Sequence, residues 1–144
     1  MTAASTRVSG TAAKALRTCK WAKIMTAWLI GRNRGKGAKW HVVDFVGPNG
    51  CESRGIVDLL AVRKNHKVHD STMKRGDLLD IVLIQVKGGS APLPTQEDID
   101  RLRKVAKYHR ARAIVLCEWK QRKRLQLSLL KRNRWIPVKP QEVF

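Results

Sequence analysis

Two apolar stretches of this chain carry polar groups at positions where a buried strand normally has none. Residues 55–62 read Gly-Ile-Val-Asp-Leu-Leu-Ala-Val, so Asp58 interrupts a run of apolar side chains. In residues 77–90, Gln85 and Lys87 lie two positions apart and therefore share one face of a strand. Such groups are costly to bury unless they pair or bind a ligand. Carboxylate and amide oxygens suit Mg²⁺, and an ammonium balances a phosphate, so the set fits phosphodiester hydrolysis.

Two further acids lie near these positions. Glu52 precedes Asp58 by six residues, and it could reach the same site from a turn or simply be a surface turn residue. Asp80 precedes Gln85 by five residues, so strand alternation places it on the opposite face. We expect Asp80, together with Asp77, to mark the start of that strand.

The surrounding pattern predicts the elements that must position these groups. A helix is expected over residues 11–30, with Trp21, Ile24, Met25 and Trp28 as its packed face. Strands follow at 40–46, 54–63 and 78–87, and then a helix capped by Thr95 and Asp98. The apolar run 113–117 suits a parallel strand after this crossover, and strands at 125–129 and 135–138 complete the order. The predicted fold is α/β, a three-layer sandwich around a central mixed sheet, with a loose arm (1–10) and one domain (11–144).

This element order, with Asp58 on the second strand and Gln85-Val86-Lys87 on the third, resembles the PD-(D/E)xK nuclease superfamily. The resemblance covers roughly residues 11–118. The superfamily includes restriction endonucleases and Holliday junction resolvases. The resemblance implies that Asp58, the Gln85 position and the Val86 carbonyl bind Mg²⁺ or Mn²⁺. It also implies that Lys87 orients or deprotonates the attacking water. Gln96 and Arg101, at the start of the following helix, are where related nucleases place residues toward the site.

The chain departs from the superfamily pattern in two places. Gln85 stands where an acid is usual, and an amide brings no charge, so a metal would bind more weakly. Many members carry a glutamate on the first helix, whereas this chain has no acid before Asp44, and Glu52 is the candidate replacement. Three plainer roles stay open: Asp58 as an ion-pair partner, Lys87 as a strand end in solvent, and Gln96 as an exposed helix position.

The charge of the chain points to a polyanionic partner. Lys and Arg number 30 against 11 Asp and Glu, giving a net charge of +19 over 144 residues. Such a surface repels itself unless it meets nucleic acid or another polyanion. Basic loops are predicted to grip a DNA backbone without reading its sequence. The predicted binding residues are Arg32, Arg34, Lys36, Lys39, Gln96, Arg101, Lys120, Arg122, Lys123 and Arg124.

The three cysteines favour a reduced, cytoplasmic protein, associated with the nucleoid if bacterial, because they form no pattern of a disulfide framework. No apolar run approaches a membrane span. We expect a metal-dependent endonuclease that hydrolyses DNA, with branched or junction DNA among its possible substrates. We also expect it to work as a homodimer. Two alternatives remain: an inactive nucleic-acid-binding module on the same fold, and an unrelated basic RNA-associated protein.

Overall fold

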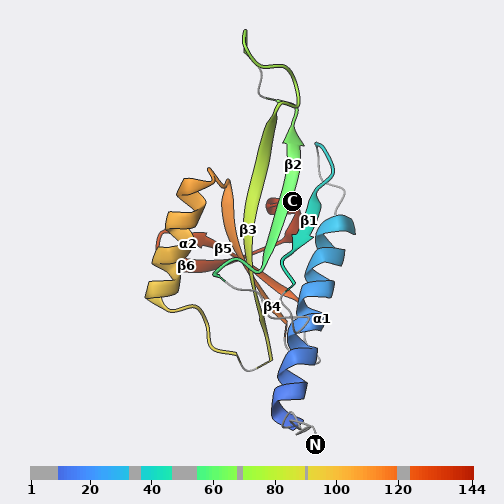
Figure 1. Cartoon of the computed structure of the whole chain (residues 1–144), viewed down its shortest axis with the longest axis vertical. Helices are drawn as coiled ribbons and strands as arrows, with labels where there is room; N and C mark the ends of the chain where they lie inside the picture. Colours follow the sequence, from blue (N-terminus) through green and yellow to red (C-terminus); the bar gives the residue numbers. More distant parts are fainter. Residues whose placement is uncertain (1–9, 33–36, 47–54, 68–69, 90, 120–123) are drawn as a thin grey trace, which may run out of the picture.

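The architecture is a six-stranded mixed sheet with one long helix on each of its faces (Figure 1). The computed structural model describes residues 10–32, 37–46, 55–67, 70–89, 91–119 and 124–144. The elements are α1 (Gly10–Arg32), β1 (His41–Asp44), β2 (Leu59–Asn65), β3 (Leu78–Gly88), α2 (Gln96–Tyr108), β4 (Ala113–Trp119), β5 (Gln126–Lys131), β6 (Arg134–Val138) and a short 3₁₀ helix, η1 (Pro140–Glu142).

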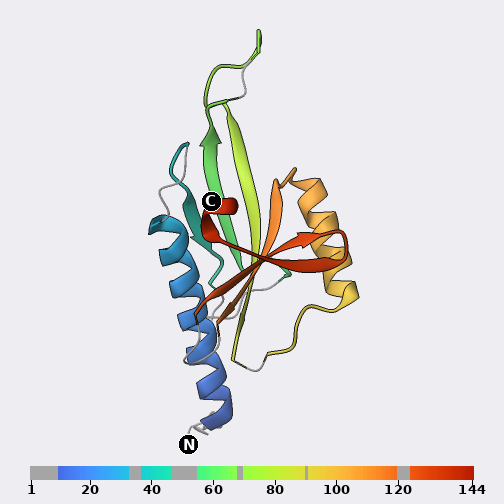
Figure 2. The ribbon, with the colours of Figure 1, turned by 180° about the vertical axis from the view of Figure 1, so that it is seen from behind.

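The strands lie in the order β1-β2-β3-β4-β5-β6, which is also their order along the chain. Only β3 and β4 run parallel, and α2 forms the crossover between them. The predicted α/β class, mixed sheet and element order are therefore confirmed. The β2–β3 hairpin projects beyond the rest of the sheet (Figures 1 and 2).

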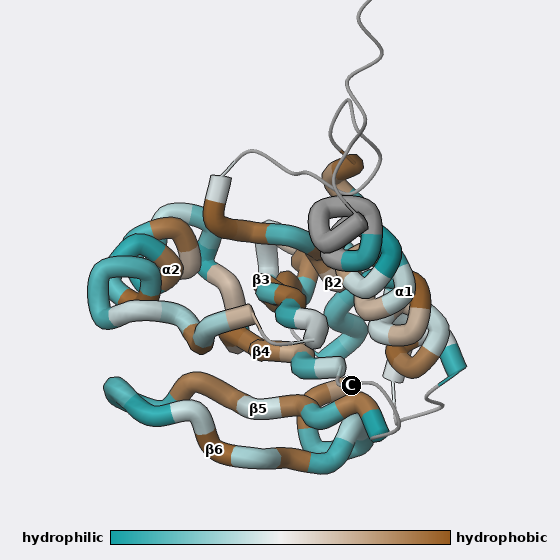
Figure 3. Tube along the Cα trace, turned by 90° about the horizontal axis from the view of Figure 1, so that it is seen from below, coloured by the Kyte–Doolittle hydropathy of each residue, from teal (hydrophilic) through white to brown (hydrophobic). Residues whose placement is uncertain are grey.

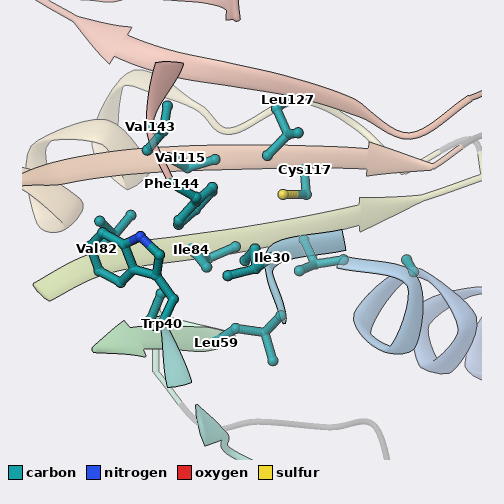
Figure 4. Close-up of a cluster of buried hydrophobic side chains, with 13 residues drawn as sticks. Ile30, Trp40, Leu59, Val82, Ile84, Val115, Cys117, Leu127, Val143 and Phe144 are labelled. Carbon is teal, nitrogen blue, oxygen red and sulfur yellow. The ribbon is translucent and has the colours of Figure 1, made fainter. Parts of the chain in front are cut away.

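Strand alternation separates two faces of the sheet, each covered by one helix (Figure 3). On the α1 face, the core gathers Leu59, Ile84, Val115 and Leu127 against Ile30 of the helix (Figure 4). Trp40, directly before β1, and Val143 and Phe144, directly after η1, close the same cluster, with the Trp40 and Phe144 rings edge to face at 5.5 Å.

On the other face, a second set of buried apolar residues lies outside that cluster. It comprises Leu83, Ile99, Leu102, Ile114 and Leu116. Ile99 and Leu102, three residues apart on one side of the helix, are the buried positions of α2. Thr95 and Asp98 form the predicted capping box, in which each side chain accepts a hydrogen bond from the backbone of the other residue.

The predicted packed face of α1 is wrong for three of its four residues. Trp21, Ile24 and Trp28 are 54%, 46% and 54% exposed. The buried face instead carries Ala22, Lys23, Thr26 and Ile30. Where α1 comes closest to β3, at Thr18, no large side chain fits: a Cβ at Gly88 would lie only 2.8 Å from Thr18 Cγ2.

Several boundaries also differ from those predicted. β1 covers only His41–Asp44 and β2 begins at Leu59, later than the predicted 40–46 and 54–63. Cys19 is disulfide-bonded, so the expectation of fully reduced cysteines is wrong for this residue, whereas Cys117 is free and buried. Among the described residues, no helix is long and apolar enough to cross a membrane.

Candidate active site

Asp58 is fixed at the junction between the 55–58 segment and β2. Its backbone N–H donates to the carbonyl of Ile84 at 3.0 Å, which extends the β2–β3 ladder by one residue. Its side-chain Oδ2 accepts the backbone N–H of Val86 at 2.8 Å. The carboxylate is therefore held against the backbone of β3 between Gln85 and Lys87, although 28 residues separate it from Val86 in the sequence.

Gln85 lies on the same face of the sheet, directly beside Asp58. The β2–β3 register pairs Leu59 with Ile84, so Asp58 falls opposite Gln85. The side chain is 5% exposed, and its Oε1 is buried without a hydrogen-bond partner in the described part of the chain. Leaving a buried amide oxygen unpaired costs about 1–3 kcal/mol, and each such group in a folded protein calls for an explanation. An unpaired oxygen next to a carboxylate is a natural place for a cation.

Lys87 completes the line of polar residues along this face of β3. It is half-buried, and its partner across the parallel β3–β4 pair is Glu118. Because aligned residues of neighbouring strands project to the same side about 5 Å apart, Glu118 lies beside Lys87. The positive charge of Lys87 also reaches α2. It helps to lower the pKa of Asp98, after the stronger effect of the Thr95 backbone hydrogen bond.

Glu118 is the residue near this site that the sequence did not single out. Its place depends on the register between β3 and β4, which is set by tertiary pairing and leaves no local pattern in the sequence. The sequence did contain one indication: Glu118 follows Leu116 by two residues at the end of an apolar strand, so both project to the same face. Leu116 is the residue paired with Gln85, and Glu118 therefore lies on the face that carries Gln85.

Asp80 occupies the opposite face of β3, as strand alternation predicted. Its carboxylate pairs with Arg63 at 3.1 Å and with Arg112 at 3.5 Å, and it accepts a hydrogen bond from Asn65 at 3.1 Å. Arg63 in turn stacks over the Trp40 ring at 4.4 Å. These ion pairs lie on the α1 face of the sheet, opposite to the face that carries Asp58 and Gln85.

The remaining predicted site residues are distributed around the molecule. Gln96 donates to Asp100 at 3.0 Å and to Asn133 at 3.4 Å, contacts that tie it to the β5–β6 turn. Arg32, Lys39, Arg101 and Arg124 are exposed. Glu52, Arg34, Lys36, Lys120, Arg122 and Lys123 lie outside the described residues. Within the described part of the chain, no group of three or more His, Cys, Asp and Glu side chains is arranged to hold a metal ion.

Comparison with solved structures finds a structural similarity, whereas comparison of the sequence finds none. No family model matches the chain, and no curated protein matches it. Among solved structures, the chain is similar to Hjc of Archaeoglobus fulgidus, a Holliday junction resolvase from an archaeal hyperthermophile. The two share 15% sequence identity with a TM-score of 0.47, and the match covers 84% of this chain and 96% of that one.

Proposed function

We propose that this protein is a metal-dependent endonuclease that hydrolyses phosphodiester bonds in DNA. The observation that carries the proposal is the line of Asp58, Gln85 and Lys87 on one face of the sheet, in which Gln85 is buried and the other two are half-buried. Within it, the Gln85 oxygen has no hydrogen-bond partner among the described residues, and the Asp58 carboxylate is anchored to the Val86 backbone. A fold stabilised only by packing has no need of three polar groups at these positions.

The donor atoms present fit a hard divalent cation. Asp58 supplies a carboxylate and Gln85 supplies the unpaired amide oxygen, both of the type that Mg²⁺ and Mn²⁺ prefer. The Val86 carbonyl and Glu52 are the further ligands we propose. A cation bound there lowers the pKa of a coordinated water and offsets the charge of the phosphate.

Lys87 has the complementary role toward the substrate. Its ammonium extends from the same face as Gln85, so it can donate to a phosphate oxygen or hold the attacking water by a hydrogen bond. Glu118 on the adjacent strand is aligned with it across the β3–β4 pair.

The charge of the molecule supports DNA as the substrate. A net charge of +19 provides the counterion-releasing contacts that dominate binding to a phosphate backbone. The exposed cations can contact the phosphate backbone, and such contacts do not depend on the base sequence. We propose branched DNA, including junctions, as the preferred target and a homodimer as the active form, because two symmetric active sites suit two symmetric cuts.

A catalytically inactive DNA-binding module is the second candidate. The observation in its favour is the uncharged Gln85 in the position of an acid, together with the absence of a three-residue acidic, histidine or cysteine cluster among the described residues. Such a protein would bind DNA by the same basic surface and would leave it uncut.

Metal-induced thermal stabilisation tests the site directly. A ligand at roughly 100 times its Kd stabilises the native state by about 2.7 kcal/mol, and we expect a corresponding rise in Tm with Mn²⁺ or Mg²⁺. Asp58→Asn can keep the hydrogen bond to Val86 but removes the charge, so the rise should disappear. Asp100→Asn, an exposed charge loss on α2, is the control that should retain it. If the metal raises the Tm of both variants equally, Asp58 is not a metal ligand.

A further inference from the structure

The side of α1 turned away from the sheet is an unusual helix surface. Trp21, Ile24 and Trp28 are about half exposed, although the opposite side of the helix is buried against the core. No described element covers them, and Figures 1 and 2 show α1 at the margin of the molecule. We define the outer face of α1 by its exposed residues Lys14, Arg17, Lys20, Trp21, Ile24, Trp28 and Arg32.

These seven residues form one continuous strip. At about 100° of rotation per residue they fall within roughly a third of the helix circumference, and the two tryptophans lie two turns apart, about 10 Å along the axis. The Arg32 guanidinium lies 4.9 Å from the centre of the Trp28 ring. The strip therefore combines three cations before Trp21 with a fourth, Arg32, beside the ring of Trp28.

The charge of the strip selects its partner. Residues 10–32 contain no Asp or Glu, so every charge on the outer face is positive. Two copies packed through this face would place like charges together, which disfavours a self-interface. A polyanion complements it, and one that also offers flat apolar groups would use the tryptophans as well as the cations.

One end of the strip lies near the end of β3 that carries Lys87. Thr18 of α1 packs on Gly88, the residue that follows Lys87, at a close approach that a side chain at Gly88 would prevent. Arg17 and Trp21, one residue before and three residues after Thr18, lie on the outer face. Because Lys87 faces the other side of the sheet from α1, a nucleic-acid strand bound at Lys87 would pass around the end of β3 at Gly88 to reach this strip.

From these observations we infer that the outer face of α1 binds single-stranded nucleic acid. Trp21 and Trp28 stack on unpaired bases, and Lys14, Arg17, Lys20 and Arg32 contact the phosphates. Duplex DNA offers no free base faces, so the tryptophans distinguish unpaired from paired strands. The inference rests on the proposed function in taking nucleic acid as the substrate, and it does not depend on cleavage.

Binding measured without divalent metal tests the inference. The full chain in EDTA is titrated with a labelled oligothymidylate and with a labelled duplex of equal length, comparing wild type with Trp21→Leu/Trp28→Leu. The double variant should lose at least about tenfold in affinity for the oligothymidylate and less than about twofold for the duplex. Tyr108→Leu, which removes an 84% exposed aromatic from α2, is the matched control and should bind both as wild type does.

Four outcomes would overturn the inference. In the first two, the double variant keeps its affinity for the oligothymidylate, or it loses affinity for the duplex by the same factor. In the other two, it loses affinity only for phosphatidylserine vesicles, or its oligomeric state changes while its affinity for DNA does not. Because the exposed tryptophans can be replaced without opening the core, equal Tm values for the variants confirm that folding is intact. Cleavage by wild type in Mn²⁺ is assayed separately. If no cleavage is found, the nuclease proposal fails, but the binding measurements in EDTA still test the role of the outer face of α1.

Discussion

Gln85 is the residue on which the chemistry of this site depends most. Its Oε1 is buried beside an anchored carboxylate and has no hydrogen-bond partner among the residues that the structure describes. A glutamate of nearly the same shape would place a second negative charge there. In the absence of metal, the two carboxylates would repel each other in a poorly solvated position, and a bound cation would relieve that repulsion.

Gln85→Glu should therefore make stability depend more strongly on metal. We expect its Tm in EDTA to be at least about 5 °C below that of wild type, with a larger rise in saturating Mn²⁺ than wild type shows. Differential scanning fluorimetry with and without Mn²⁺ measures both quantities. A Tm rise no larger than that of wild type would mean that position 85 does not face a metal.

Much of this residue-level arrangement could be predicted from the sequence. Gln85 and Lys87 share a face because side-chain alternation in a strand is strict, and Asp80 lies on the other face for the same reason. The ion pairs of Asp80 with Arg63 and Arg112, and the place of Glu118 beside Lys87, could not be predicted. They depend on which strands become neighbours, and no local pattern specifies that.

At the scale of elements, the contact between α1 and β3 determines which side of α1 faces the core. Three- and four-residue spacing of Trp21, Ile24 and Trp28 predicts a helix correctly but assigns its buried side wrongly. Thr18 against Gly88, and Ala22 and Thr26 against the sheet, allow an approach that indole rings would block. Periodicity locates an apolar face, whereas the space available decides whether that face is the buried one.

Gly88→Ala should destabilise the protein through this contact. The added Cβ would lie 2.8 Å from Thr18 Cγ2 and 3.1 Å from the Thr18 carbonyl oxygen, so α1 would have to shift. Overpacking of this kind costs about 1–3 kcal/mol, which urea unfolding measures. Gly31→Ala, in the last turn of α1 with nothing within 4 Å, should be neutral or slightly stabilising. Equal stability of the two variants would contradict the close approach.

The capping box of α2 predicts a pH dependence. The Thr95 backbone hydrogen bond, above all, lowers the pKa of Asp98. A carboxyl whose pKa is lower in the folded state adds stability above its unfolded pKa, about 3.9, and loses that stability as the pH falls through the folded value. Asp98→Asn should therefore cost about 0.5–1 kcal/mol at pH near 7 and progressively less below pH of about 4.

Urea unfolding of Asp98→Asn and wild type across this pH range measures the difference. Glu97→Gln removes a neighbouring first-turn carboxylate that makes no capping bond, and it should show a smaller effect. A constant difference between Asp98→Asn and wild type down to pH of about 2.5 would show that the carboxylate charge contributes nothing to the cap.

At the scale of the whole molecule, the fold brings the strand ends, the start of α2 and the N-terminal half of α1 to one region. Parallel pairing of β3 and β4 requires a crossover, and the apolar run at 113–117 after a capped helix predicted it. The net charge of +19 could be counted from the sequence, but the outer face of α1 appears only once the helix has a defined buried side. That face and the active-site face lie on different sides of the sheet and meet near Gly88.

Cleavage by wild type and Lys87→Ala is the measurement that tests the central claim most directly. Labelled linear, flapped and four-way-junction DNA are incubated with each protein in Mg²⁺ or Mn²⁺, and binding is measured in parallel. We predict cleavage by wild type, a loss of at least about 100-fold in rate for Lys87→Ala, and retained binding by both. Tight binding without cleavage by either protein would contradict the nuclease account and leave a DNA-binding module whose Gln85 site is inactive.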